Sequence, residues 1–137
     1  MRGDRGAIDG LRTLAAALET AGHTILTTHL LDDNVEGAES TLTERAVYAR
    51  DIAWLDSCDL LIAEASGSSF GVGFEVGYVL GRSDRRDQRV LLLYRSDRRD
   101  AISRLIVGNA HPRCDVLKYE NPEELALRVT ESLKPRA

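Results

Sequence analysis

The strongest constraint on the fold is an apolar run that ends in a loop of small residues and continues as a helix. Residues 60–63, Leu-Leu-Ile-Ala, have the unbroken apolar character of a strand buried on both faces. Serines and glycines dominate the loop at 66–71, and helical spacing begins near Val72. A strand, such a loop and a helix N-terminus form an anion- or sugar-binding corner at the carboxyl edge of a parallel sheet. This segment therefore predicts both the fold class and the position of a ligand site.

Helical and extended patterns alternate along the rest of the chain. Helices are expected at residues 7–21, 43–57, 72–82, 101–107 and 122–133, and strands at 24–30, 59–64, 89–94 and 115–119. Strands that alternate with helices form a mainly parallel sheet covered on both faces. A length of 137 residues is that of one domain. We therefore expect a single three-layer α/β domain over residues 1–137.

The start of the chain departs from this plan. An α/β domain of this kind normally opens with a strand, yet residues 1–6 resemble the loop that follows such a strand. We expect the first strand to be missing from this chain, because the start was assigned too late or the chain was trimmed. The alternative is a fold that tolerates the loss.

The hexapeptide Arg-Ser-Asp-Arg-Arg-Asp occurs twice, at residues 82–87 and 95–100. Both copies follow apolar elements, and the residues around them do not match. We interpret the repetition as solvated loop composition or coincidence rather than as a structural repeat.

Composition excludes several function classes. The net charge is -4, and acids and bases are interspersed without a basic face, so nucleic acid is not an expected partner. The longest apolar stretches fall well short of the ~20 residues of a membrane helix, and residues 1–13 contain no signal peptide. Cys58 and Cys114 lack metal-site spacing, so we expect two thiols in a reducing cytoplasm and no bound metal.

One candidate catalytic acid, Glu75, is expected about one turn into the helix that follows the small-residue loop. There the helix dipole and free N–H groups favour the ionised carboxylate. An ionised carboxylate beside a phosphate-sized loop favours attack on a sugar carbon over simple binding. The alternative is an acid that only complements the dipole.

The second candidate acid is Asp51, within the helical pattern at 43–57. It shares a helix face with Val47, Trp54 and Leu55, and apolar neighbours raise the pKa of a carboxyl group. The alternative is a partly exposed Asp51 paired with a nearby arginine. One ionised and one protonated carboxyl group are what glycoside cleavage with retention uses: the first attacks the anomeric carbon and the second protonates the leaving group.

The candidate substrate-binding residues are small or polar residues expected near the carboxyl edge. They are Ser69, Gly71, Gly73, Arg2, Gly3, Ser103 and His29. Serine hydroxyls and loop N–H groups bind phosphate, glycines leave room for a ligand, and a guanidinium pairs with phosphate in a bidentate way. Plain turns, helix starts, a disordered N-terminus and a structural histidine are the alternatives. The sequence has no H-E-x-x-H, P-loop lysine or G-x-S-x-G motif, which argues against zinc protease, ATPase and α/β-hydrolase chemistry.

Three segments carry a resemblance to a known family. Residues 49–55, 58–64 and 69–77, the last reading Ser-Phe-Gly-Val-Gly-Phe-Glu-Val-Gly, resemble the nucleoside 2-deoxyribosyltransferase superfamily. The chain looks closest to its 2'-deoxynucleoside 5'-monophosphate N-glycosidase branch. The similarity extends from Arg2 to about the last helix and is strongest over 49–81. It implies a flavodoxin-like fold.

The resemblance also implies roles for individual residues. Glu75 would be the nucleophile at C1' of deoxyribose, Asp51 would assist the departing base, and Ser69 would bind the 5'-phosphate. The family's Arg-Gly segment corresponds to residues 2–3. A serine that reaches the phosphate from a neighbouring subunit corresponds to Ser103, which implies a homodimer with a shared active site. No metal or organic cofactor is expected.

The function expected from this resemblance is hydrolysis of the N-glycosidic bond of 2'-deoxynucleoside 5'-monophosphates through a covalent glycosyl-glutamate intermediate. Two alternatives stay open: base exchange by a deoxyribosyltransferase, and a non-catalytic nucleotide-binding domain. The expected loss of the first strand motivates the second alternative, because in relatives that strand carries a pocket aromatic residue and a serine.

Overall fold

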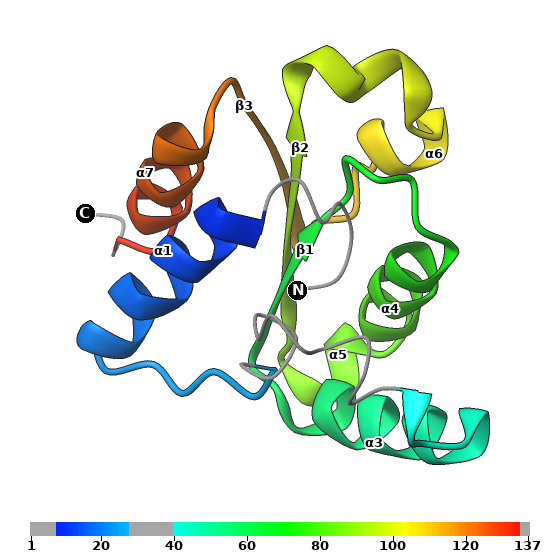
Figure 1. The fold of residues 1–137 in the computed structure, drawn as a ribbon. Helices are drawn as coiled ribbons and strands as arrows, with labels where there is room; N and C mark the ends of the chain where they lie inside the picture. The colour runs from blue at the N-terminus through cyan, green and yellow to red at the C-terminus, as the bar shows by residue number, and fades with distance from the viewer. Residues whose placement is uncertain (1–7, 28–39, 135–137) are drawn as a thin grey trace.

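The structure is a computed structural model that describes residues 8–27 and 40–134. Its elements, in chain order (Figure 1), are α1 (Ile8–Thr20), α3 (Glu44–Ser57), β1 (Leu60–Glu64), α4 (Phe70–Leu80), α5 (Ser83–Arg86), β2 (Arg89–Arg95), the 3₁₀ helix η3 (Ser96–Ala101), α6 (Arg104–Val107), β3 (Cys114–Tyr119) and α7 (Pro122–Ser132). In these two ranges no helix combines the length and the apolar character needed to cross a membrane.

The described strands form one parallel sheet in the order β1-β2-β3. Leu60 pairs with Arg89 across β1 and β2, and Val90 pairs with Cys114 across β2 and β3. Helices α1 and α7 pack together on one side of the sheet, whereas α3 and α4 lie on the other side (Figure 1). The predicted α/β architecture with a parallel sheet is confirmed.

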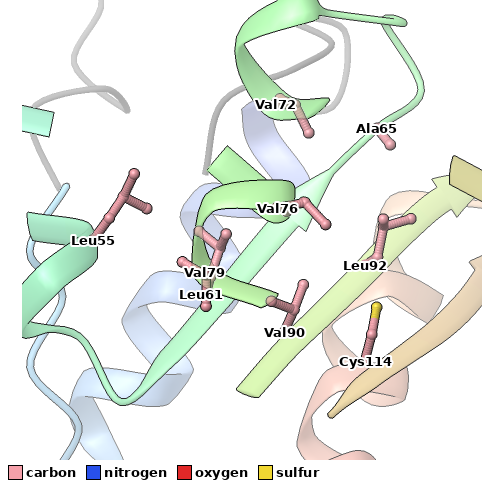
Figure 2. Packing of buried hydrophobic residues seen from close by; sticks show 10 residues of the cluster. Leu55, Leu61, Ala65, Val72, Val76, Val79, Val90, Leu92 and Cys114 are labelled. Carbon is pink, nitrogen blue, oxygen red and sulfur yellow. The ribbon is translucent and has the colours of Figure 1, made fainter. Parts of the chain in front are cut away.

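Alternate side chains of β2 enter two different cores, as the two-residue period of a strand requires. Val90 and Leu92 point toward α4, where they meet the buried stripe Val72, Val76 and Val79 (Figure 2). On the opposite face, side chains of the intervening residues pack against α1 and α7. This two-sided burial explains why the strand segments are apolar throughout rather than alternating.

The strand expected at residues 24–30 is wrong over its described part, because residues 24–27 form no strand, and residues 28–30 lie outside the described residues. The apolar and β-branched composition predicted a strand, but a segment becomes a strand only where its backbone pairs with a neighbouring strand. In the described sheet, β1 pairs with β2 only. Residues 22–27 and the segment 57–62 instead line a cavity of about 460 Å³. Without a ladder partner, apolar composition alone does not produce a strand.

Two helix boundaries also differ from expectation. Helix α4 begins at Phe70, with Ser69 as its N-cap, rather than near Val72. The single helix expected at 101–107 is two short pieces, η3 and α6, separated by extended backbone at Ile102. Each copy of the repeated hexapeptide lies at a short helical turn, α5 in one case and η3 in the other. The two copies therefore share a local structure, one before β2 and the other after it.

A polar bridge joins α3 to α4. The Tyr78 hydroxyl donates a 2.6 Å hydrogen bond to Asp56 Oδ1, and the Arg82 guanidinium contacts both groups. The hydrogen bond to the Asp56 carboxylate raises the pKa of Tyr78 above its usual value. The bridge holds together the two helices that carry the candidate catalytic acids.

The packing of α1 on α7 can be tested at Gly10. A Cβ there would lie 3.0 Å from Leu125 Cδ2 and 3.3 Å from Pro122 Cα, so α7 would have to move. We expect Gly10→Ala to lower the free energy of unfolding, because overpacking costs ~1–3 kcal/mol whereas alanine gains ~1 kcal/mol in a helix. Gly77→Ala is the matched control: its Cβ meets nothing within 4 Å, so it should stabilise the protein. Urea unfolding of both variants checks this, and equal stabilisation by the two would contradict the packing.

Candidate active site

The turn from β1 into α4 forms the predicted corner at the carboxyl edge of the sheet. Ser69 Oγ accepts a 3.4 Å hydrogen bond from the Val72 N–H and so caps the helix. The N–H groups of Phe70 and Gly71 find no acceptor in the described part of the chain. Free N–H groups at a helix N-terminus attract a negatively charged ligand.

A buried acid, Glu64, supports this loop from below. It is the last residue of β1 and is 0% exposed. Its Oε1 accepts hydrogen bonds from the Ser66 N–H, at 3.0 Å, and from the Ser66 hydroxyl. Ser66 Oγ in turn accepts a 2.8 Å hydrogen bond from the Arg95 N–H at the end of β2. The loop is thus tied to two strands.

The segment after β2 holds the other side of the loop. Arg98 Nε donates a 3.0 Å hydrogen bond to the Ser66 carbonyl, and the Ser68 hydroxyl donates one of 2.6 Å to the Ala101 carbonyl. Ser68 has a left-handed backbone with φ 53°, a conformation that non-glycine residues hold only where neighbours stabilise it. The Arg98 guanidinium therefore places a positive charge beside a loop of defined shape.

Glu64 and Arg98 are not among the site residues that the sequence predicts. A signal for Glu64 was present, because one acid closes an otherwise apolar strand directly before the loop. A buried strand end tolerates an acid only where hydrogen bonds satisfy it. Arg98 gave no such signal, because it lies 32 residues from Ser66 in a segment that resembles a solvated loop.

Glu75 lies in the second turn of α4, because the helix begins at Phe70. Glu75 therefore lies beyond the first turn, so the support expected from the free N–H groups and the dipole is weaker than predicted, and the alternative of a first-turn acid that only complements the dipole is wrong. The side chain is partly buried, and helix geometry directs it back toward Gly71, four residues earlier. A Cβ added at Gly71 would meet only Ser69 Oγ, at 3.5 Å, and one at Gly73 would meet nothing within 4 Å. Open space therefore lies beside both glycines.

Asp51 is partly buried on α3, with 19% of its side chain exposed. It pairs with Arg50, whose Nη2 lies 2.9 Å from Asp51 Oδ1 and whose guanidinium stacks over the Trp54 ring at 4.8 Å. The arginine pair given as the alternative is therefore present, and Leu55, expected on the same helix face, is buried in the core. Any proton transfer by Asp51 takes place beside this cation.

The two acids lie on helices that cover the same side of the sheet. Asp51 shares a face of α3 with Leu55, four residues later, which is buried in the core against α4. Glu75 shares a face of α4 with Tyr78, three residues later, which bonds to α3. The two helices that carry the acids thus pack against each other.

The other candidate residues have mixed outcomes. Ser103 is exposed and caps α6 by accepting a 3.2 Å hydrogen bond from the Leu105 N–H. It lies two residues after Ala101, whose carbonyl accepts the hydrogen bond of Ser68, so its segment lies beside the loop of the same chain. Arg2, Gly3 and His29 lie outside the described residues. Within the described ranges, no three His, Cys, Asp or Glu side chains are placed to hold a metal ion.

Neither thiol takes part in this corner. Cys58 is the C-cap of α3 and Cys114 begins β3, and both are free thiols. Burial raises the pKa of Cys58, and it raises the pKa of Cys114 to about 11, with a further contribution from neighbouring Asp115. Both thiols are therefore protonated at neutral pH, which makes them poor nucleophiles.

Several proteins of similar sequence are named N-hydrolases. A protein of Thermofilum pendens, provisionally named 2'-deoxynucleoside 5'-phosphate N-hydrolase 1, is 36% identical over 98% of this chain and 90% of its own length. The 5-hydroxymethyl-dUMP N-hydrolase of Danio rerio is 31% identical over 90% of this chain and 84% of its own length. The human protein of that name is 34% identical over 76% of this chain and 59% of its own length.

A family model supports the same relationship over most of the chain. It describes the nucleoside 2-deoxyribosyltransferase family and matches residues 5–126, a range that includes Asp51, Glu64, Ser69 and Glu75. The parallel sheet and the loop at its carboxyl edge agree with this match. The chain therefore belongs to the nucleoside 2-deoxyribosyltransferase family.

Proposed function

We propose that this protein hydrolyses the N-glycosidic bond of 2'-deoxynucleoside 5'-monophosphates and releases the free base and 2-deoxyribose 5-phosphate. The observation that carries the proposal is the position of Glu75 on the helix whose first N–H groups, at Phe70 and Gly71, have no acceptor in the described part of the chain. The names of the similar N-hydrolases support the same reaction.

In this mechanism, Glu75 attacks C1' of the sugar and forms a covalent ester as the bond to the base breaks. Asp51 gives a proton to the departing base, so that the base leaves neutral. Water then attacks C1', its proton passes to Asp51, and the Glu75 carboxylate is released. Two displacements at one carbon return the original configuration.

The phosphate occupies the corner beside the loop. Ser69 and the free N–H groups of α4 donate hydrogen bonds to it, and Arg98 adds a positive charge. Gly71 and Gly73 leave room for the sugar. In a homodimer, Ser103 of a second copy completes the phosphate site.

The remaining candidate residues complete the proposed site. Arg2 pairs with the phosphate through its guanidinium, Gly3 lets the backbone approach it, and His29 lines the pocket. We place the enzyme in the cytoplasm, where its two free thiols stay reduced.

Replacement of Glu75 tests the nucleophile. Glu75→Ala and Glu75→Gln should abolish base release, because neither side chain can form the ester, while a deoxynucleoside monophosphate still binds. Chromatography of the free base and calorimetric titration of the nucleotide measure the two properties. Glu123→Gln, a change of an exposed acid on α7, is the control and should keep full activity. More than a few per cent of wild-type activity in the Glu75 variants would remove this residue from the mechanism.

Replacement of Asp51 tests the general acid. Asp51→Asn should lower kcat by ~10²- to 10⁴-fold, the usual contribution of a positioned acid. The loss should shrink for a nucleotide whose base leaves readily without a proton. Comparison of kcat for two such substrates in both proteins provides the measurement. An equal loss for both substrates would show that Asp51 does not protonate the base.

The family description favours one alternative, transfer of the deoxyribosyl group to a second base. Both reactions share the covalent intermediate and differ in what attacks it. Incubation of a deoxynucleoside or its monophosphate with a different free base distinguishes them, because a new nucleoside or nucleotide indicates transfer and reducing sugar indicates hydrolysis. If nucleotide raises the melting temperature but no base appears at high protein concentration, the chain is a binding domain instead.

A further inference from the structure

We propose that Glu64 is a positioning residue that acts through Ser66 to hold the phosphate-binding loop at 66–69 in its ligand-ready shape. This inference rests on the proposed function, in that the loop is taken to be the phosphate site. Glu64 lies below the loop and is fully buried, so it acts on the substrate only through the residues above it.

Four hydrogen bonds fix the position of Ser66. Its N–H and hydroxyl both donate to Glu64 Oε1, its Oγ accepts from the Arg95 N–H at 2.8 Å, and its carbonyl accepts from Arg98 Nε at 3.0 Å. The two bonds to Glu64 fix both the backbone and the side chain of Ser66. The position of Ser66 then sets where the following residues of the loop lie.

The backbone of the loop is strained at Ser68. Ser68 has a left-handed backbone, which costs of order 1–3 kcal/mol and persists only where the surroundings enforce it. Its N–H donates to the Ala65 carbonyl at 3.1 Å, and its hydroxyl donates to the Ala101 carbonyl. Ser66 lies in the chain between Ala65 and Ser68. The contact of Ser66 with Glu64 therefore helps to enforce the turn that leads to Ser69.

The burial of the Glu64 carboxyl group is energetically costly. A buried charge destabilises a protein unless hydrogen bonds compensate for it, and an apolar residue at this position would avoid that cost. Tyr119, which is 1% exposed, also faces this group: burial first, and then the charge of Glu64, raise the pKa of Tyr119 to about 12. The tyrosine hydroxyl thus stays protonated next to the carboxyl group across the neutral pH range. Polar groups from β1, the loop and β3 converge below the phosphate site.

Gln88 offers a matched control. It is also 0% exposed, and its Nε2 donates to the carbonyls of Leu55, at 2.6 Å, and Cys58, at 2.8 Å. It precedes β2 and therefore lies at the amino edge of the sheet, away from the loop. Loss of either buried polar side chain should destabilise the fold, but only loss of Glu64 should change the loop.

The test compares Glu64→Met, Glu64→Gln and Gln88→Met. Hydrogen exchange followed by NMR should show at least tenfold faster exchange of the Ser68 and Val72 amides in Glu64→Met than in Gln88→Met. Exchange rates in the two variants are compared at equal global stability, set with a low concentration of urea. Glu64→Gln, which keeps one acceptor for Ser66, should fall between Glu64→Met and the wild type. Unchanged exchange in Glu64→Met would overturn the proposal.

A ligand measurement completes the test. Glu64→Met should raise KM for a deoxynucleoside monophosphate by about tenfold, the lower end of what loss of an outer-shell contact costs at metal sites, while kcat changes little. Binding of inorganic phosphate should weaken in parallel, and neither should change in Gln88→Met. A fall in kcat with unchanged KM and phosphate affinity would overturn the proposal. If the wild type releases no base, the proposed reaction fails, and amide exchange and phosphate binding still decide the role of Glu64.

Discussion

The parallel pairing of β1 with β2 is the constraint on which the candidate site depends. Glu64 lies opposite Leu93, and the ladder continues one step further, where the Ala65 N–H donates to the Leu93 carbonyl at 2.8 Å. At the next step a side chain replaces the backbone, because Ser66 Oγ accepts the Arg95 N–H. The end of the ladder is therefore also the start of the loop. Whatever fixes the strand register fixes where the loop and α4 begin.

The two fully buried amide and carboxyl side chains lie at opposite ends of the sheet. Gln88 closes the amino edge by bonding to the carbonyls at the end of α3, which have no partner within the helix. Glu64 acts at the carboxyl edge, where it accepts from the chain instead of donating to it. The difference follows from the backbone groups available at each end. Carbonyls at a helix C-terminus need a donor, whereas the N–H and hydroxyl of a turn need an acceptor.

The electrostatics around the two candidate acids differ more than their helical positions suggest. Asp51 has Arg50 within 2.9 Å, held in place by stacking on Trp54. Glu75 lies beyond the first turn of α4, beside glycines that leave open space. The two candidate acids therefore lie in different surroundings, one beside space for a ligand and the other beside a guanidinium.

Local sequence was sufficient to predict the elements whose buried residues recur at regular spacing. The apolar run before Glu64, the serine and glycine loop and the helical spacing of Val72, Val76 and Val79 predicted β1, the turn and α4, and these are confirmed. The strand expected at 24–30 failed over 24–27 because strand formation depends on a neighbouring edge. No local pattern can report whether a segment will pair with that edge.

The supporting contacts of the site were decided by tertiary structure alone. Arg98 reaches Ser66 across 32 residues, and Arg95 reaches it across 29, because parallel strands bring their carboxyl ends to one edge. The pair of Asp51 with the adjacent Arg50 was an alternative that the sequence left open, because the weak amphipathic pattern of α3 did not reveal which of its side chains face the core. By itself, the sequence determined which residues could do chemistry at the edge of a sheet. The fold decided which groups hold them there, since hydrogen bonds between distant segments form only after the strands have paired.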